Sequence, residues 1–456
     1  MEYKKLSLLD SIMLIMGSMI GSGIFIVPAA MSRDLGSPTL LLLAWVATAL
    51  LTVMAALSYG ELGAMFPKAG GQYVYLRQAY NKLFGFLYGW TLFTVIQTGT
   101  IAAVAVAFAK FSGVFFPAIS DSNYLFKLGP VHLQTQQLLG IAVVWILTLS
   151  NFRSVKSGAF VQNVFTFTKI GAVLFLIGAG LYHAFTQDLT PVDWSVPKGT
   201  LTMGFLGIFS AAMVGSIFSA DAWNNITFTG SEIEKPERNL PLSLAIGTLA
   251  VSLIYIFINW VYVQAIPFDA IQSADNDRVG TLLLQTVFGN AGMFLMAALI
   301  MISTFGCING LTLSGGRVYY AMAKDGLFFG KAKELNKYHS PQFALIIQGI
   351  WTSILALSGS YGNLLDYVVF AVLVFYILTV AGVFILRKKQ PDTPRPYKVW
   401  GYPVLPALYI IAALFICINL LIYKPDYTYP GLGIVLLGVP VYFLVRKWGK
   451  SDAEEG

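Results

Sequence analysis

Residues 16–28 read Met-Gly-Ser-Met-Ile-Gly-Ser-Gly-Ile-Phe-Ile-Val-Pro, an apolar run that is interrupted by Gly21-Ser22-Gly23 and closes on Pro28. A second apolar run is interrupted at residues 215–223, Gly-Ser-Ile-Phe-Ser-Ala-Asp-Ala-Trp. In lipid every backbone N–H and C=O group needs a partner, so a break in a spanning helix persists only beside a cavity or a ligand. Two interrupted segments at matching places in two halves of a chain indicate a secondary transporter, with its substrate site between them.

The composition around these runs is typical of an all-α membrane protein. Of the 456 residues, 57% are hydrophobic and 11% are charged, whereas about 25% are charged in an average soluble protein. Apolar runs of about 20 residues, the length that crosses the hydrocarbon core, recur along residues 1–456, which we interpret as a single transmembrane transporter domain. We expect about twelve spans, near residues 7–31, 39–64, 83–110, 136–152, 157–183, 201–230, 240–265, 281–322, 342–357, 363–387, 402–423 and 430–446.

The distribution of Lys and Arg predicts the orientation of these spans. If both termini are cytoplasmic, the 29 Lys and Arg residues divide roughly four to one in favour of the cytoplasmic loops, with Lys169 in mid-membrane, which follows the positive-inside rule. The net charge of +7 is therefore explained by topology. It gives no reason to expect a nucleic-acid partner.

The span count divides the chain into two halves. Residues 7–183 hold five expected spans, residues 201–387 hold five more, and residues 402–446 hold two additional helices. Because the number per half is odd, the second half enters the bilayer with opposite polarity, and each half begins with a broken helix. This arrangement predicts an inverted repeat with the binding site near the midplane.

The chemistry of the two breaks suits a zwitterion. Gly21 and Gly23 allow a ligand close to the backbone, and the half-helix that follows presents free N–H groups and a positive dipole end, which favour a carboxylate. The second break leaves the carbonyls of Ile217, Phe218 and Ser219 without helical partners, which favours an ammonium group. Glycines at this spacing are also typical of helix packing, and that alternative stays open on the glycines alone.

Several motifs resemble one transporter family. Residues 20–25 (IGSGIF) resemble the first-helix motif of the amino acid–polyamine–organocation superfamily, and residues 69–76 (AGGQYVYL) its first cytoplasmic loop helix. Residues 223–225 (WNN) with 235–241 (KPERNLP) and the stretch around Ser154 and Lys169 resemble the L-type amino acid transporter branch. The resemblance extends from about residue 5 to residue 400.

The resemblance implies the leucine-transporter fold of ten helices plus two, and alternating access to L-amino acids. Carried over by position, the substrate carboxylate would be held by Gly21, Ser22, Gly23 and Ile24, and the amino group by the backbone of Ile217, Phe218 and Ser219, with the Phe218 ring as outer gate. Asp221 departs from the small residue frequent in L-type members. The loop at residues 111–135 lacks the cysteine that links vertebrate members to a glycoprotein, so no disulfide-linked ancillary subunit is expected.

Three ionisable residues stand out. Lys169 lies about 18 Å from the start of its expected helix, and an ionisable group at such depth is a functional candidate. The resemblance implies that its ammonium replaces a sodium ion near the first break; a structural cation that caps helix carbonyls is the alternative. Asp221 could accept hydrogen bonds from freed N–H groups or contact a polar or cationic cargo. For Glu61, near the end of the second helix, we expect a solvated or loop-pairing carboxylate.

Other functions fit the sequence less well. The three histidines fall in or near loops without a His-Glu-x-x-His motif, which disfavours an intramembrane metalloenzyme, and one chain with two unlike breaks does not resemble a channel filter. We therefore expect no enzyme, no metal site and no cofactor. The prediction is a sodium-independent transporter of neutral L-amino acids in the plasma membrane that works by exchange, with proton-coupled symport as the alternative.

Overall fold

The first break separates two helices at the start of the chain. The computed structural model of the protein describes residues 5–68, 70–120, 122–128, 131–152, 155–196, 203–358 and 361–454, so Ala69, Ser154 and the beginning of the 201–230 span lie outside the described residues. Within this range α1 (Leu8–Met19) and α2 (Gly23–Leu35) meet at a bend of 42°. The predicted interruption at Gly21-Ser22-Gly23 is therefore confirmed, with the break itself at residues 20–22 because Gly23 is the first residue of α2.

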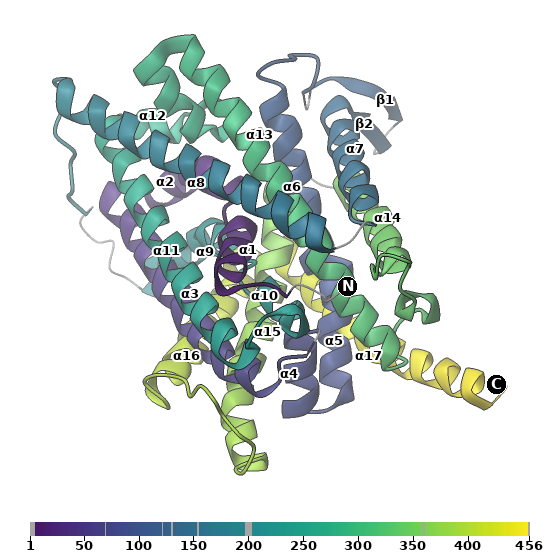
Figure 1. Ribbon diagram of the computed structural model, residues 1–456. Helices are drawn as coiled ribbons and strands as arrows, with labels where there is room; N and C mark the ends of the chain where they lie inside the picture. Colours follow the sequence, from purple (N-terminus) through teal and green to yellow (C-terminus); the bar gives the residue numbers. More distant parts are fainter. Residues whose placement is uncertain are drawn as a thin grey trace.

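Helices form nearly all of the remaining structure (Figure 1). In chain order they are α3 (Pro38–Met65), α4 (Gln72–Ala79), α5 (Lys82–Thr91), the π-helical turn η1 (Leu92–Ile96), α6 (Gln97–Ser112), α7 (Thr135–Ser150), α8 (Val155–Thr186), α9 (Met203–Ser219), α10 (Asn225–Phe228), η2 (Gly230–Glu232), α11 (Pro236–Ala265), α12 (Phe268–Gln272), η3 (Asp275–Asp277), α13 (Val279–Lys324), η4 (Gly330–Lys333), α14 (Gln342–Ser358), α15 (Tyr361–Lys389), α16 (Val404–Tyr423) and α17 (Pro425–Glu454).

Many of these helices can span a bilayer. In the described part of the chain, eight helices are long and apolar enough to cross a membrane, and nine if the bent pair of α1 and α2 counts as one span. Three shorter apolar helices, α7, α9 and α14, occupy the places of other expected spans. The chain is thus a helical multi-pass membrane protein, and the number of twelve crossings stays a prediction.

Three details differ from the sequence-based expectation. Strands β1 (Tyr124–Leu128) and β2 (Val131–Gln134) pair as an antiparallel hairpin between α6 and α7, so the fold is not purely helical. The expected span 281–322 bends at Gly289, where φ is 62° and only glycine is unstrained. The span 83–110 contains a π-helical turn at Leu92–Ile96, a feature that hydropathy does not reveal.

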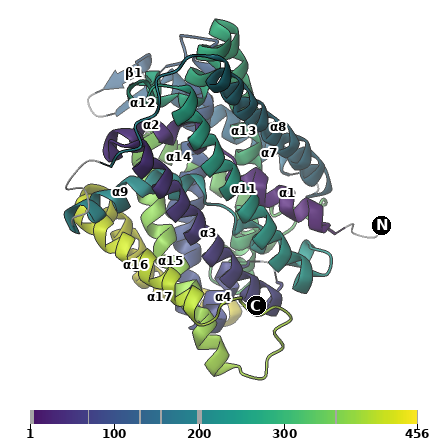
Figure 2. The ribbon, with the colours of Figure 1, turned by 90° about the vertical axis from the view of Figure 1, so that its left-hand side faces the viewer.

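The broken helices lie inside the bundle. In Figure 1, α1 and α10 lie near the middle of the molecule, and α1 packs against α8, α11 and α13. Both views show the β1–β2 hairpin and α12 at one end, and α4 with the loop between α15 and α16 at the opposite end (Figure 2). These positions place the interruptions between the two ends of the bundle.

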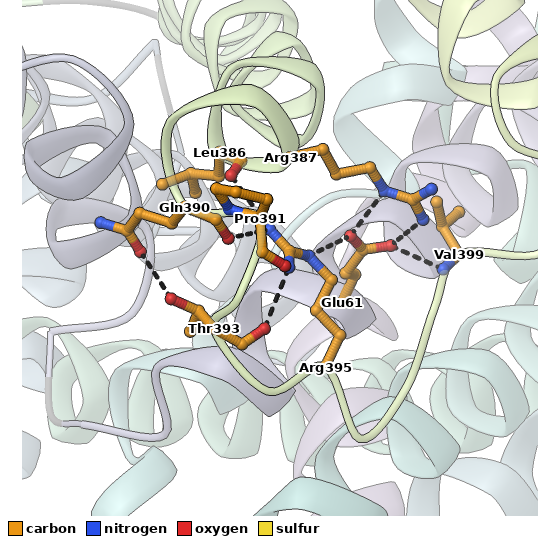
Figure 3. A network of polar contacts seen from close by, with 8 residues as sticks. All are labelled: Glu61, Leu386, Arg387, Gln390, Pro391, Thr393, Arg395 and Val399. Carbon is orange, nitrogen blue, oxygen red and sulfur yellow. Dashed lines mark hydrogen bonds and ion pairs between the residues drawn. The ribbon is translucent and has the colours of Figure 1, made fainter.

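An ion-pair cluster fastens the loop after α15 to α3 (Figure 3). The Glu61 carboxylate, on a side chain that is 1% exposed, accepts hydrogen bonds from Arg387 at 2.9 and 2.7 Å and from the Val399 N–H at 2.8 Å. Arg395 forms an ion pair with the same carboxylate at 3.5 Å and donates to the carbonyl oxygens of Leu386, near the end of α15, and Gln390 in the loop. The loop-pairing interpretation of Glu61 is confirmed, and the solvated one is wrong.

Candidate functional site

The Lys169 ammonium compensates the negative charge of the peptide dipoles at the C-terminal end of α1. Its Nζ donates to the carbonyl oxygens of Gly17 at 2.6 Å and Ile20 at 3.0 Å, and the side chain is 0% exposed. No ion pair to Lys169 is found among the described side chains. The C-terminal end of a helix carries about half a negative charge, so the ammonium is balanced by peptide dipoles. The structure thus shows that Lys169 caps the carbonyl groups at the end of α1. A role of Lys169 in the coupling of transport stays a prediction.

Three further donors satisfy the same turn of α1, and sequence reasoning missed all of them. They are Ser303 Oγ to Ile20 O at 3.1 Å, Cys307 Sγ to Ser18 O at 3.2 Å and Tyr255 OH to Met19 O at 2.9 Å. Ser303 and Cys307 come from α13 and Tyr255 from α11, within long apolar runs. Only the tertiary fold brings them to the break, so no local motif could have identified them.

The α2 side of the first break keeps donors for a ligand. At the start of α2 the Phe25 N–H turns back to Ser22 O at 3.1 Å, while the first N–H groups of a helix have no partner within it. Gly23 and Ile24 belong to that first turn, and both side-chain positions are buried. Because side chains satisfy the α1 carbonyls, the unpaired polarity of this break is positive, which suits a carboxylate.

The second break begins later than the expected residue 215, because α9 stays helical up to Ser219. Helix α9 ends at Ser219, and the Asp221 N–H donates to Phe218 O at 3.2 Å, so the Ile217 carbonyl loses its helical donor whereas the Phe218 carbonyl accepts one hydrogen bond. Ala222 follows in a left-handed conformation with φ 68°. This conformation costs a non-glycine residue about 1–2 kcal/mol, and such strain clusters at functional sites.

The two breaks touch each other. A Cβ atom added to Gly23 would overlap Ser219 Oγ and lie 3.1 Å from Ser219 Cα, so only glycine permits this approach. Phe218 is buried, with 7% of its surface exposed. The structure therefore brings together the residues proposed for the two ends of a zwitterion. Binding by Gly21, Ser22, Gly23, Ile24, Ile217, Phe218, Ser219 and Asp221 stays a prediction.

Side chains of α15 and α4 form hydrogen bonds to residues of the second break. Tyr376 OH donates to Asp221 Oδ1 at 2.5 Å. Beyond it, Asn224 Nδ2 donates to Gln72 Oε1 at 3.0 Å and Gln72 Nε2 donates to Thr379 Oγ1 at 3.0 Å. These contacts tie α10 to α4 and α15. Neither Tyr376 nor Thr379 could be identified from the sequence, because both lie in an uninterrupted apolar run.

Known proteins are similar to this chain over nearly its whole length. The family profile described as "Amino acid permease" matches residues 6–440. The chain is 30% identical over 449 residues to the "Serine/threonine exchanger SteT" of Bacillus subtilis (strain 168), covering 97% of each protein. It is 30% identical to the mouse "b(0,+)-type amino acid transporter 1" (97% of this chain, 88% of the relative) and to the human "Large neutral amino acids transporter small subunit 2" (98% and 81%).

These relatives are named as transporters and exchangers. The match to the family profile extends from before α1 to α17 and includes both breaks. The protein is therefore a membrane transporter and not an enzyme. The recognition of the amino acid–polyamine–organocation superfamily from its motifs is confirmed. The chain belongs to the amino acid permease family.

Proposed function

We propose that this protein exchanges neutral L-amino acids across the plasma membrane by alternating access. The observation that carries the proposal is the contact between the two breaks at Gly23 and Ser219. One break offers N–H groups and the other a carbonyl without its helical donor. An amino acid carries a carboxylate and an ammonium group a few ångströms apart, so its two charges match the two polarities. The family and the printed names of the relatives support this cargo.

The position of the Lys169 ammonium supports transport that does not depend on sodium. Its ammonium already occupies the carbonyls of Gly17 and Ile20. A metal cation at the same carbonyls would lie within a few ångströms of this charge, where like charges repel strongly in a medium of low dielectric constant. The carrier then needs no bound sodium ion to hold α1 in place, and obligatory exchange follows if the empty carrier reorients slowly.

The transport cycle follows from the broken helices. The cargo binds between the breaks, Phe218 closes above it, and the bundle that holds α1 and α9 rocks against the other helices. In this proposal residues 7–183 and 201–387 are the inverted repeats of the leucine-transporter fold, 402–446 adds two helices, and both termini are cytoplasmic. No disulfide-linked subunit takes part.

Counterflow in proteoliposomes tests the proposal. Vesicles loaded with an unlabelled neutral amino acid should take up the labelled one saturably, whereas empty vesicles should not. Uptake should be the same in sodium and in choline buffer. Absence of saturable uptake for every amino acid in a full panel would contradict the proposed function.

Proton-coupled symport is the second candidate. It is favoured by the partly buried Asp221 carboxylate, which lies within the second break and accepts a hydrogen bond from Tyr376. A carboxylate at this place could carry a proton together with the cargo. Concentrative uptake into empty vesicles that is driven by an inward proton gradient would favour symport over exchange.

A further inference from the structure

A small cavity lies beside the second break, and four of its lining residues, Gln72, Asp221, Asn224 and Tyr376, make the hydrogen bonds described above. Ala222 and residues of α4, α5, η1, α6, α10, α13 and α15 complete the lining. The space open to the centre of a water molecule is about 10 Å³, which is enough for about one water or one group of similar size. The cavity therefore accepts a single small polar group.

Two residues that line this cavity carry polar atoms without partners. The Tyr88 hydroxyl on α5, which lies beside the Asn224 side chain, and the Asn225 Oδ1 on α10 are buried and make no hydrogen bond of normal geometry to another described residue. The Tyr88 and Asn225 side chains are only 1% and 2% exposed. Leaving a buried polar group unsatisfied costs about 1–3 kcal/mol, so we expect a group in the cavity to complete both hydrogen bonds.

The chemistry of the two atoms defines that group. A carboxamide oxygen only accepts a hydrogen bond, while a tyrosine hydroxyl can donate one. A hydroxyl group can donate to Asn225 and accept from Tyr88 at the same time, whereas a methyl group of similar size satisfies neither. An ammonium group donates only and leaves the Tyr88 hydroxyl without an acceptor for its proton.

The position of the cavity connects it to the cargo. Asp221 and Ala222 directly follow the segment at which the proposed function places the amino group, and the side chain of an amino acid leaves the carbon next to that group. We propose that Tyr88 and Asn225 determine specificity and select small amino acids whose side chain carries a hydroxyl group. This inference rests on the proposed function and names its substrate class.

Threonine and valine are the sharpest pair of probes, because they have the same shape and differ by a hydroxyl in place of a methyl group. The kcat/KM values of exchange are measured for both in proteoliposomes. One or two hydrogen bonds to an otherwise unsatisfied site should favour threonine by about tenfold or more. Tyr88→Phe and Asn225→Leu should each move the threonine-to-valine ratio towards one.

Tyr319→Phe is the matched control. The Tyr319 hydroxyl is also buried and without a partner among the described residues, but Tyr319 packs against Phe93 and Phe328 and does not line the cavity. Its loss should leave the ratio unchanged. Size-exclusion profiles and thermal unfolding in detergent verify that each variant is folded, and Tyr88→Phe decides the question if Asn225→Leu does not fold.

The possible results distinguish a failure of the specificity inference from a failure of the proposed function. Equal kcat/KM values for threonine and valine in the wild type would overturn the specificity inference while leaving amino acid exchange intact. The same holds if the ratio is unchanged in Tyr88→Phe, which would indicate that the cavity holds only a structural water. If no amino acid is exchanged at all, the proposed function fails, and this inference fails with it.

Discussion

At the scale of single residues, Lys169 has the clearest expected effect. Its Nζ is the donor found for Gly17 O and shares Ile20 O with Ser303. Hydrogen bonds from a charged group contribute about 1.5–3 kcal/mol each. Lys169→Met keeps an unbranched side chain that is one atom shorter but removes both bonds, so α1 should lose its fixed position. We expect exchange, measured by counterflow, to fall at least tenfold, since about 1.4 kcal/mol corresponds to that factor.

Ser303→Ala is the companion variant for Lys169→Met. It removes one donor to Ile20 O and leaves both bonds of Lys169, so exchange should fall by less. Comparable purified yield and monodispersity of the two variants would exclude a folding defect as the cause. Unchanged exchange kinetics in folded Lys169→Met would show that the ammonium is dispensable and would remove the argument for sodium independence.

Substitution of Gly23 tests whether the contact between the two breaks is needed for binding of the amino acid. In Gly23→Ala the new Cβ would lie 2.8 Å from Ser219 Cβ and closer to its Oγ, and forcing extra atoms into a packed site costs about 1–3 kcal/mol. The two breaks must move apart, so KM for the amino acid should rise or exchange should cease. Gly171→Ala on α8 is the control, because nothing lies within 4 Å of its added Cβ. Equal KM values in the two variants would argue against a shared binding site.

The residues that could be predicted are those whose own neighbourhood in the sequence is unusual. Gly21, Gly23 and Asp221 interrupt apolar runs, and Lys169 is a lone charge in one, so each violates a local rule that lipid enforces. Tyr255 and Tyr376 violate none, since tyrosine is ordinary in an apolar helix. Their partners, Met19 O and Asp221, are more than 150 positions away along the chain, and only the fold brings them together.

At the scale of elements, the Glu61 cluster joins α3, α15 and the loop to α16. Removing one partner of a buried ion pair leaves the other charge uncompensated, which costs about 3–5 kcal/mol when both are fully buried. Arg387 is 23% exposed, so we expect Glu61→Gln to lower the free energy of unfolding by about 2–3 kcal/mol. The midpoint of thermal unfolding in detergent should fall accordingly.

Asp277→Asn provides the comparison for Glu61→Gln. It breaks the ion pair with Arg33, in which the two side chains are 45% and 33% exposed. Exposed pairs contribute about 0–1 kcal/mol, so the unfolding midpoint should change little. Equal shifts for the two variants would show that the loop after α15 is not held by Glu61.

The helices could be predicted from the sequence, whereas the kink at Gly289 and the β1–β2 hairpin could not. Long apolar runs impose helices because lipid offers backbone groups no other partner, and α3 and α11 begin and end within a few residues of expectation. The kink at Gly289 lies in an apolar run, where a lone glycine is common in membrane helices. The hairpin at Tyr124–Gln134 has ordinary loop composition, and its pairing depends on contacts that hydropathy does not describe.

At the scale of the whole molecule, the arrangement of charge predicts which end faces the cytoplasm. The loop between α15 and α16 carries Arg395 and Lys398 and lies at the end with α4, whereas the β1–β2 hairpin lies at the opposite end. The positive-inside rule places the first end in the cytoplasm. The inverted repeat, which would produce this asymmetry from two halves, stays a prediction because it was inferred only from span number and break position.

Labelling of single cysteines tests this orientation. Cys307 and Cys417 are both buried, so the wild-type chain should react little with a membrane-impermeant maleimide and serves as the background. Asp392, in the loop between α15 and α16, and Ser122, just before β1, are both exposed. Asp392→Cys should be labelled in inside-out vesicles and protected in intact cells, and Ser122→Cys should show the reverse pattern. If the two patterns were exchanged, both termini would be extracellular, although the site between the breaks would be unaffected.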